Sequence, residues 1–183
     1  SLREAVSIAA TYTSVPAALP DFPVVVCAAG QRWVWDGVSF EMLGPVAPEG
    51  SGNDDSCVLR VSGSGGAVLL TGDIEAAGER RLVERYGDRL GSEALVAPHH
   101  GSKTSSTAAF LDRVSPRLVL IPAGYLNRFN FPHPAVVARY QSRQAELLTT
   151  GDSGAITLEV TADPGRLLPQ PFRQQYRRYW SGP

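Results

Sequence analysis

The sequence predicts an α/β fold, a sandwich with a mixed sheet. From about residue 70 onward, short apolar runs typical of buried strands alternate with amphipathic helical runs. Before that point, aromatic and apolar residues alternate on both sides of Asp36-Gly37, a dipeptide that favours a two-residue hairpin turn. The 18 Gly and 14 Pro among 183 residues also favour many short elements over long helices.

Length and composition describe a single globular domain. The chain has 183 residues, of which 43% are hydrophobic and 19% are charged, a balance that argues against a disordered chain. The formal net charge of −1 excludes a generally cationic nucleic-acid coat, although not a local basic groove. No apolar run approaches the ~18 residues that span a bilayer. We see no basic and apolar targeting segment in these residues.

The hydrophobic pattern places the first elements in order. We expect β-structure over residues 24–43 and a Pro/Gly loop over 44–53. Strands at 56–62 and 67–71 flank a Gly-rich turn. An amphipathic helix over 74–86 follows, with two apolar side chains inward (Leu82, Val83) and four charged ones outward (Glu75, Glu79, Arg80, Glu84).

The second half continues the alternation. Buried strands are predicted at 94–97 and 118–121, and helices at 107–114 and 135–142, the first of them capped by Ser105 or Ser106. A final strand pair is expected from residues 146–150 and 155–160, and a Pro- and Arg-rich tail begins at Asp163. The domain division is therefore 1–160 for the folded part and 161–183 for the tail.

Two features of the sequence indicate a catalytic or metal-binding site. Asp73 follows Gly72 at the carboxyl end of one apolar strand, and His99-His100 stand at the carboxyl end of the next. Because sites in open α/β sheets assemble at that edge, the carboxylate and the imidazoles are expected to converge in one cleft. Asp with His is a ligand set suited to Zn, Mn or Fe.

Less specific interpretations remain open for the same residues. Asp73 could be the N-cap of the helix that follows it, and a histidine after a strand is usually a packing or hydrogen-bonding residue. The chain has only three histidines, and a closed two-metal site usually needs more imidazole. Cys27 and Cys57, each in an apolar stretch, are either buried free thiols or, in an oxidising compartment, a disulfide.

The motifs together resemble a known family. The strings Leu69-Leu70-Thr71-Gly72-Asp73-Ile74-Glu75 and Pro98-His99-His100-Gly101-Ser102-Lys103-Thr104-Ser105-Ser106 occur in order. With Asn53–Leu59, Asn127-Arg128-Phe129 and Pro132-His133-Pro134, they closely resemble the C-terminal metallo-β-lactamase-like domain of ComEC-type DNA-uptake channels. The agreement covers roughly residues 20–160.

The resemblance implies a four-layer αββα metallo-hydrolase sandwich, of which this chain would be the C-terminal portion with mixed sheets. Asp73 would bridge the metals, and His99 or His100 would be a ligand. His133 would join them as a catalytic residue. Two divalent ions, Zn or Mn, and no small-molecule cofactor are implied for the complete domain. The substrate loops would carry Asn53, Asp54, Ser56, Ser102 and Lys103, and Thr149, Thr150 and Gly154 match the closing strand turn.

The departures from the family matter as well. The family's HxHxDH-like metal signature is absent, and Ser1–Val6 resembles the helix that follows it, so the chain looks like a C-terminal fragment that binds no metal tightly and is inactive alone. Many members carry a His where Phe131 stands, so a substrate-contacting role there passes to His133 or is lost.

Three functions follow from the resemblance. The first is a metal-dependent nuclease that degrades the non-transported strand during DNA uptake, with single- or double-stranded DNA and the protein's own transmembrane channel as partners. The second is a non-catalytic module that packs against the channel and guides DNA with the Arg and aromatic residues of the tail. The alternative use of the aromatic residues is to cover a sheet edge (Tyr176, Tyr179, Trp180). The third is a free-standing small-molecule hydrolase, which agrees less well with the two sequence motifs at residues 69–75 and 98–106.

Location and the cysteines are linked. The resemblance implies a parent protein in the bacterial inner membrane, with this domain on the periplasmic side if it meets incoming DNA before transport. Such compartments permit disulfides. We therefore predict that Cys27 and Cys57 are bonded or close enough to bond.

Overall fold

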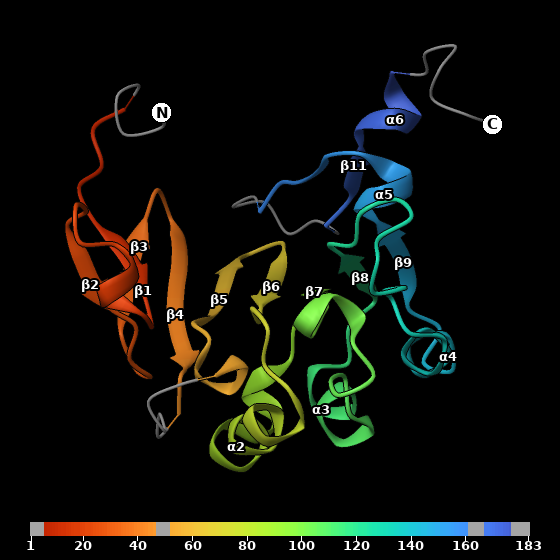
Figure 1. Cartoon of the computed structure of the whole chain (residues 1–183), viewed down its shortest axis with the longest axis horizontal. Helices are drawn as coiled ribbons and strands as arrows, with labels where there is room; N and C mark the ends of the chain where they lie inside the picture. The colour runs from red at the N-terminus through yellow and green to blue at the C-terminus, as the bar shows by residue number, and fades with distance from the viewer. Residues whose placement is uncertain (1–5, 47–51, 161–166, 177–183) are drawn as a thin grey trace.

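A computed structural model describes residues 6–46, 52–160 and 167–176. Its central element is a seven-stranded sheet in the order β3-β4-β5-β6-β7-β8-β9, which follows the order of the chain (Figure 1). A two-stranded sheet flanks each end of it, β1-β2 beside β3 and β10-β11 beside β9. The predicted α/β class with a mixed sheet is confirmed. The segment Ser1–Val6, expected to be helical, lies outside the described residues except for Val6.

The first four strands of the large sheet are antiparallel. They are β3 (Arg32–Trp35), β4 (Val38–Gly44), β5 (Val58–Gly63) and β6 (Gly66–Leu70). Asp36 and Gly37 connect β3 to β4 and both have positive φ, 50° and 76°, as a primed hairpin turn requires. The hairpin predicted from Asp-Gly is confirmed.

The last four strands of this sheet are parallel. β6 pairs with β7 (Ala94–Val96), then β8 (Leu118–Ile121) and β9 (Glu146–Thr149) follow. The crossovers carry α2 (Ala76–Tyr86), α3 (Ala108–Val114) and α4 (Pro134–Gln141). Single 3-10 turns lie at Pro16–Ala18, Asn53–Asp55, Gly87–Leu90 and Pro98–Gly101.

The predicted final strand pair is wrong. β9 pairs with β8, whereas β10 (Ile156–Leu158) pairs with β11 (Pro169–Pro171) in a separate sheet. Between β9 and β10 the short helix α5 (Thr150–Ser153) changes the chain direction, because the Thr149 hydroxyl accepts the Asp152 N–H and starts a helical turn. A further short helix, α6 (Phe172–Gln175), follows β11.

The N-terminal strands, of which the sequence predicted β2 but not β1, lie outside the large sheet. β1 (Thr11–Thr13) and β2 (Val24–Val26) form a parallel pair of their own, so β2 does not join the hairpin sheet. A disulfide attaches this pair to the large sheet: Cys27, just after β2, is bonded to Cys57, just before β5, with the Cα atoms 5.7 Å apart. The predicted bond is confirmed, and neither cysteine is a free thiol.

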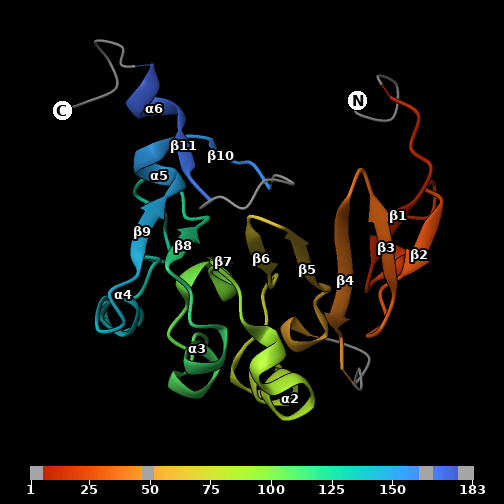
Figure 2. The same ribbon diagram turned by 180° about the vertical axis from the view of Figure 1, so that it is seen from behind.

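The main core lies between the sheet and its helices. Leu69, Leu95 and Val119, one from each of three adjacent strands, face α2, α3 and α4 and are fully buried with Phe110 and Val136. The helices lie along one side of the curved sheet in both views (Figures 1 and 2). At about 1.5–3 kcal/mol per fully buried large apolar side chain, this layer dominates the stability of the described fold.

Two details of the helices correct the sequence analysis. Glu79 was predicted to face outward but is fully buried, because its carboxylate accepts the backbone N–H groups of Ser106 and Thr107 at the start of α3. Those bonds replace the predicted cap: the Ser105 hydroxyl donates to the Pro98 carbonyl and the Ser106 hydroxyl contacts that of Tyr140.

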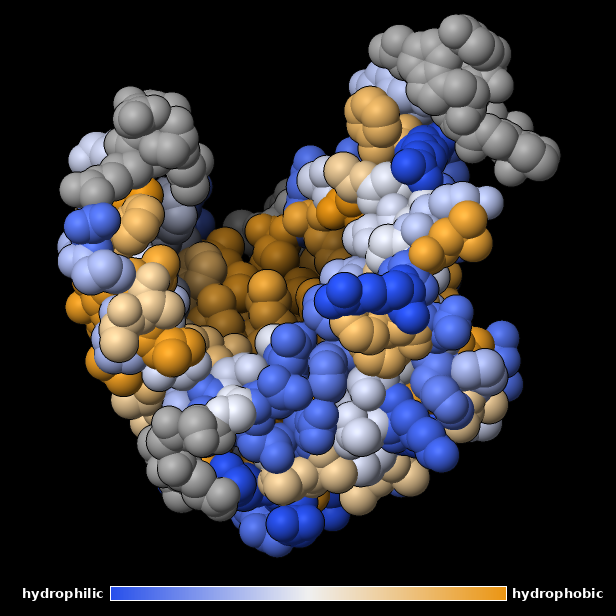
Figure 3. Space-filling model, in the orientation of Figure 1, coloured by the Kyte–Doolittle hydropathy of each residue, from blue (hydrophilic) through white to orange (hydrophobic). Residues whose placement is uncertain are grey.

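The described residues cover the opposite face of the sheet only in part. Beside β10 and β11, Val68, Leu118 and Leu167 are buried in a second, smaller cluster. Farther along the same face, Leu70 keeps 38% of its surface exposed. Figure 3 shows this face as a hollow lined by hydrophobic residues between the two raised ends of the molecule.

Candidate functional site

The candidate site is built from two loops at the carboxyl ends of the parallel strands β6 and β7. Gly72 and Asp73 follow β6, and His99 and His100 follow β7. The His99 N–H donates to the Gly72 carbonyl over 3.1 Å and ties the loops together. Gly72 has φ +57°, and a Cβ there would lie 2.8 Å from the Ser56 Cβ, so only glycine fits this turn.

The histidine loop has an unusual backbone. His99 and His100 both have positive φ, 46° and 56°, a conformation that costs non-glycine residues free energy and is concentrated at functional sites. The following Gly101 has φ +81°, and a Cβ there would lie 2.7 Å from the Pro132 Cβ. The loop is therefore packed tightly in a strained conformation.

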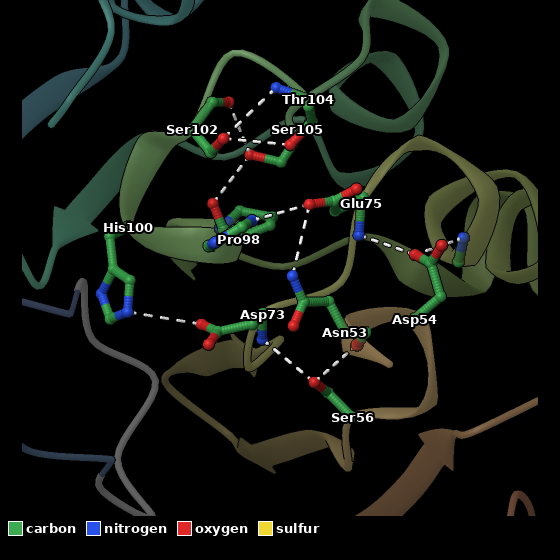
Figure 4. A network of polar contacts seen from close by, with 12 residues as sticks. Asn53, Asp54, Ser56, Asp73, Glu75, Pro98, His100, Ser102, Thr104 and Ser105 are labelled. Atoms are coloured by element: carbon green, nitrogen blue, oxygen red, sulfur yellow. Dashed lines mark hydrogen bonds and ion pairs between the residues drawn. The ribbon is translucent and has the colours of Figure 1, made fainter. Parts of the chain in front are cut away.

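The structure brings Asp73 together with one of the two histidines, His100. Nε2 of His100 lies 3.4 Å from Oδ1 of Asp73, with both side chains nearly half exposed (Figure 4). Nδ1 of His100 is 2.9 Å from the Pro122 carbonyl, an acceptor that orients the ring so that Nε2 faces Asp73.

His99 has a carboxylate partner that the sequence analysis missed. Its Nδ1 lies 3.0 Å from Oε1 of Glu75, which was predicted to point into solvent. Glu75 is the N-cap position of α2 and also accepts a 3.3 Å hydrogen bond from the Asn53 amide. Glu75 could have been identified from the sequence by its position two residues after Asp73, in the same strand-to-helix turn.

The loop over Asn53–Ser56 lies beside the site, as the family resemblance implies. The Ser56 hydroxyl accepts the Asp73 N–H over 3.1 Å and donates to the Asn53 carbonyl. Oδ1 of Asp54 accepts the N–H groups of Glu75 and Gly78, at 2.7 and 2.8 Å. Asp54, and not Asp73, thus supplies the carboxylate cap of α2, which leaves the Asp73 carboxylate at the site.

The remaining predicted residues surround the histidine loop. Ser102 is buried and its hydroxyl contacts that of Thr104 at 3.0 Å, whereas Lys103 is exposed. His133 begins α4: its Nδ1 accepts the Ala135 N–H over 3.2 Å, and its own N–H donates to the Gly101 carbonyl. His133 is thus joined to the loop through backbone, with its imidazole engaged as a helix cap.

A buried polar network supports this loop from behind. The Glu79 carboxylate holds Ser106 and Thr107, and Nη1 of Arg139 donates to the Ser105 and Ser106 carbonyls at 2.8 and 2.6 Å. Burial raises the pKa of the Glu79 carboxyl above its usual value, against the opposing effect of those hydrogen bonds. Burial also raises the pKa of Tyr140, whose hydroxyl lies 2.6 Å from that of Ser106, to about 12.

The donor set fits part of a metal centre. Asp73 and His100 present a carboxylate oxygen and an oriented imidazole nitrogen to the same space, as ligands of a divalent ion do. Within residues 6–46, 52–160 and 167–176, no group of three or more His, Cys, Asp or Glu side chains is placed to hold an ion. Any further ligands must therefore come from outside these ranges.

A cavity of about 300 Å³ opens beside the histidine loop, between the β8–α4 loop and the start of α5. Tyr125 and Phe131 form its aromatic walls, and Asn130, Thr149 and Asp152 are its polar lining. A hydrogen bond from the Thr150 hydroxyl to the Ala123 carbonyl joins the two segments.

The fold and site define a class: an α/β protein with a carboxylate and imidazoles gathered at the carboxyl edge of its parallel strands. No family model matches the chain. The chain is 44% identical over 153 residues to competence protein ComA of Neisseria gonorrhoeae, covering 83% of this chain and 22% of that protein. It is 33% identical to the uncharacterized protein YcaI of Escherichia coli K12 (84% of this chain, 20% of YcaI) and to recombination protein 2 of Haemophilus influenzae (85% and 19%).

The chain therefore belongs to the ComA/ComEC family of competence proteins. It spans about a fifth of the length of these curated relatives. Among solved structures, a Thermotoga maritima protein of the metallo-beta-lactamase superfamily matches with a TM-score of 0.40 and 14% identity over 70% of this chain and 72% of that one. No helix among the described residues is long and apolar enough to cross a membrane.

Proposed function

We propose that this chain is the DNA-processing part of a competence protein, and that it supplies one side of a metal-dependent phosphodiesterase site. Family membership supports the competence role. The observation that carries the site is the 3.4 Å approach of His100 Nε2 to Asp73 Oδ1, with His100 Nδ1 held by the Pro122 carbonyl. Metal-binding histidines are typically oriented in this way, with one ring nitrogen held by a backbone carbonyl and the other directed toward the metal position.

Each residue then has a role. Asp73 and His100 would hold a divalent ion, Zn or Mn, with further ligands from outside the described residues, and His99, held by Glu75, would support the loop beside them. The ion would polarise a phosphodiester and stabilise the leaving oxygen. The exposed Lys103 and the nearby His133 are placed for contacts with phosphate, and the Asn53–Ser56 loop holds Asp73 in position. Among the described residues the site has two of these ligands, so activity would require further ligands from outside them.

The open sheet face supports the same proposal. Residues 1–160 would form one half of an αββα sandwich, and a second sheet from the rest of the protein would cover the apolar hollow in Figure 3. Residues 161–183 would form a C-terminal extension, of which the part at 167–176 packs beside β10 through Leu167 and β11.

The disulfide supports an extracytoplasmic location. Disulfides persist in oxidising compartments such as the periplasm and are rare in the cytosol. We therefore place this domain on the outer side of a bacterial inner membrane, as the part of a DNA-uptake protein that meets double- or single-stranded DNA next to its transmembrane channel.

The test uses the full gene in the transforming host. Asp73→Asn and His100→Gln should each abolish the release of acid-soluble nucleotides from labelled donor DNA, with the protein still present at normal levels. Asp88→Asn is the matched control, since that side chain is 90% exposed and lies away from the site. Unchanged nucleotide release in both site variants would contradict the nuclease proposal.

A second candidate function is a non-catalytic module that guides DNA. It is favoured by the exposed rings of Phe172 and Tyr176, whose centroids lie 4.9 Å apart beside the exposed Arg173. Tyr179 and Trp180, also predicted for this role, lie outside the described residues. Under this alternative Asp73→Asn leaves nucleotide release intact, whereas Phe172→Ala with Tyr176→Ala reduces DNA uptake.

A further inference from the structure

The loop between β8 and α4 exposes several large apolar side chains beside the candidate site. Tyr125 is 74% exposed, Leu126 is 85% exposed and Phe129 is 59% exposed. Such a concentration of exposed aromatic and apolar surface on one short loop marks a contact site for a ligand or a partner.

The loop is held in one conformation despite its exposure. The Asn127 amide donates to the Gly124 and Phe131 carbonyls, at 3.1 and 2.7 Å, and its side-chain oxygen accepts the Phe131 N–H at 3.0 Å. Leu126 and Asn130 both have positive φ, 49° and 53°, so the loop carries backbone strain. A preorganised loop binds with a smaller entropy penalty than one that must be ordered.

The aromatic rings form a row that leads to the site. Phe129 and Phe131 are stacked with their centroids 5.5 Å apart and an interplanar angle of 20°. Phe131 is stacked in turn with His100, at 6.4 Å and 18°. The row therefore runs from an exposed ring to the imidazole that faces Asp73.

The polar surroundings suit a nucleic-acid strand. Arg128 is exposed and its guanidinium lies 4.6 Å from the Phe129 ring centroid. On the other side of the cavity, Arg173 donates to the Gly151 carbonyl and is also exposed. The aromatic walls of this cavity can stack on bases, and the two guanidinium groups beside it can bind phosphates.

We infer that this surface binds an unpaired stretch of DNA, with one base inserted between Tyr125 and Phe131 and the next stacked on Phe129. A base that stacks on Phe129 displaces the Arg128 guanidinium from the ring, and this group then contacts the phosphate. The bound strand leads along the ring row toward Asp73 and His100. The inference deepens the proposed function, on which it rests for the choice of DNA as the ligand.

Stacking is what distinguishes a single strand from a duplex here. The faces of paired bases are covered by their neighbours in the duplex, so only an unstacked base can place its face against Tyr125 or Phe129. Arginine contacts to phosphate alone would bind both forms. The geometry therefore predicts a preference for the single strand that depends on the rings.

The test measures binding by the 183-residue chain in the presence of EDTA, so that hydrolysis plays no part. Fluorescence anisotropy of a labelled 20-nucleotide oligothymidylate, the matching duplex and an abasic strand of the same length gives three affinities. We expect the oligothymidylate to bind most tightly. Tyr125→Ala and Phe129→Ala should each weaken its binding by roughly 5- to 100-fold, the range for loss of one stacked base. Neither change should affect the abasic strand.

Two controls separate the contributions. Trp35→Ala removes another exposed aromatic ring, 75% exposed on β3 at the far end of the sheet, and should leave all three affinities unchanged. Arg128→Ala should reduce the slope of log affinity against log salt by about 0.7, the value for one phosphate on a single strand.

Three results would overturn the inference. They are duplex binding at least as tight as single-strand binding, no effect of either aromatic substitution, or an equal effect on the abasic strand. The second of these would indicate a protein segment as the occupant of the loop. Because the assay needs no metal and no turnover, it can fail while nucleotide release still depends on Asp73, and the two proposals are tested separately.

Discussion

The Asp54 carboxylate lies directly against the backbone of Gly78, with no room between them for a side chain at position 78. Oδ1 of Asp54 accepts the Gly78 N–H over 2.8 Å, and a Cβ added to Gly78 would lie 2.6 Å from that same oxygen. Because Asp54 also accepts the Glu75 N–H, this contact fixes the turn that carries Asp73.

Gly78→Ala is therefore expected to destabilise the fold, although alanine usually stabilises a helix by about 1 kcal/mol relative to glycine. Displacement of the cap removes about 0.5–2 kcal/mol and adds a steric clash, so we expect a net loss of about 1–2 kcal/mol. Urea denaturation measures the change. In an Asp54→Ala background, where the clash is absent, the same substitution should become neutral or stabilising. A loss of equal size in both backgrounds would contradict this account.

Glu79→Gln tests the buried carboxyl. Because burial raises the pKa of Glu79 in the folded state, its favourable contribution is fully present below the unfolded pKa and is lost as pH rises through the folded pKa. The wild type should therefore gain stability relative to Glu79→Gln as pH falls from 7 toward 5. The free energies of unfolding at the two pH values give the result. Glu84→Gln, which changes an exposed carboxylate, should show no such shift. The prediction would be refuted if the wild type became less stable relative to Glu79→Gln as pH falls.

The disulfide closes a loop with a sequence separation of 30. Chain-entropy estimates give about 3–4 kcal/mol for a loop of this length, so Cys27→Ser with Cys57→Ser should lower the free energy of unfolding by that amount. Reduction of the wild type should have the same effect and none on the double variant. Free-thiol titration of the unreduced, denatured wild type should give no reactive thiol, and two would disprove the bond.

Metal binding by the isolated chain is expected to be weak. Catalytic zinc normally has three protein ligands, whereas Asp73 and His100 supply two. Chain purified without chelator should therefore carry far less than one equivalent of zinc or manganese in elemental analysis. Added Mn²⁺ should bind in a manner that Asp73→Asn removes. Stoichiometric metal retained through gel filtration would show that the described residues form a more complete site than we infer.

Sequence patterns were most informative where backbone topology decides the outcome. The proximity of Asp73 and His100 follows from strand order, since the carboxyl ends of adjacent parallel strands share one sheet edge. Asp36-Gly37 likewise determines its own turn. The turn depends on local backbone preferences of Asp36-Gly37, and the proximity of Asp73 and His100 depends on the strand order of the sheet.

Patterns failed where a polar side chain finds a distant backbone partner. A charged residue at the position of Glu79 on an amphipathic helix usually faces solvent. The Glu79 carboxylate instead accepts hydrogen bonds from backbone N–H groups 27 and 28 residues away. Glu75 was also predicted to face solvent, but its carboxylate contacts the side chains of His99 and Asn53. The Gly151–Gly154 segment has the composition of a hairpin turn, but a side-chain cap from Thr149 makes it helical. The contacts of Glu79 and Glu75 depend on tertiary distances, and the Thr149 cap on a local side-chain geometry, neither of which periodicity encodes.

The network behind the histidine loop also has a genetic consequence. Glu79 on α2, Tyr140 and Arg139 on α4, and Ser106 before α3 meet in one buried cluster, so the three helices share a single set of hydrogen bonds. Loss-of-function alleles selected at random should therefore include changes in α2 and α4 whose side chains never approach DNA. Second-site suppressors of one such allele should map to another of these helices.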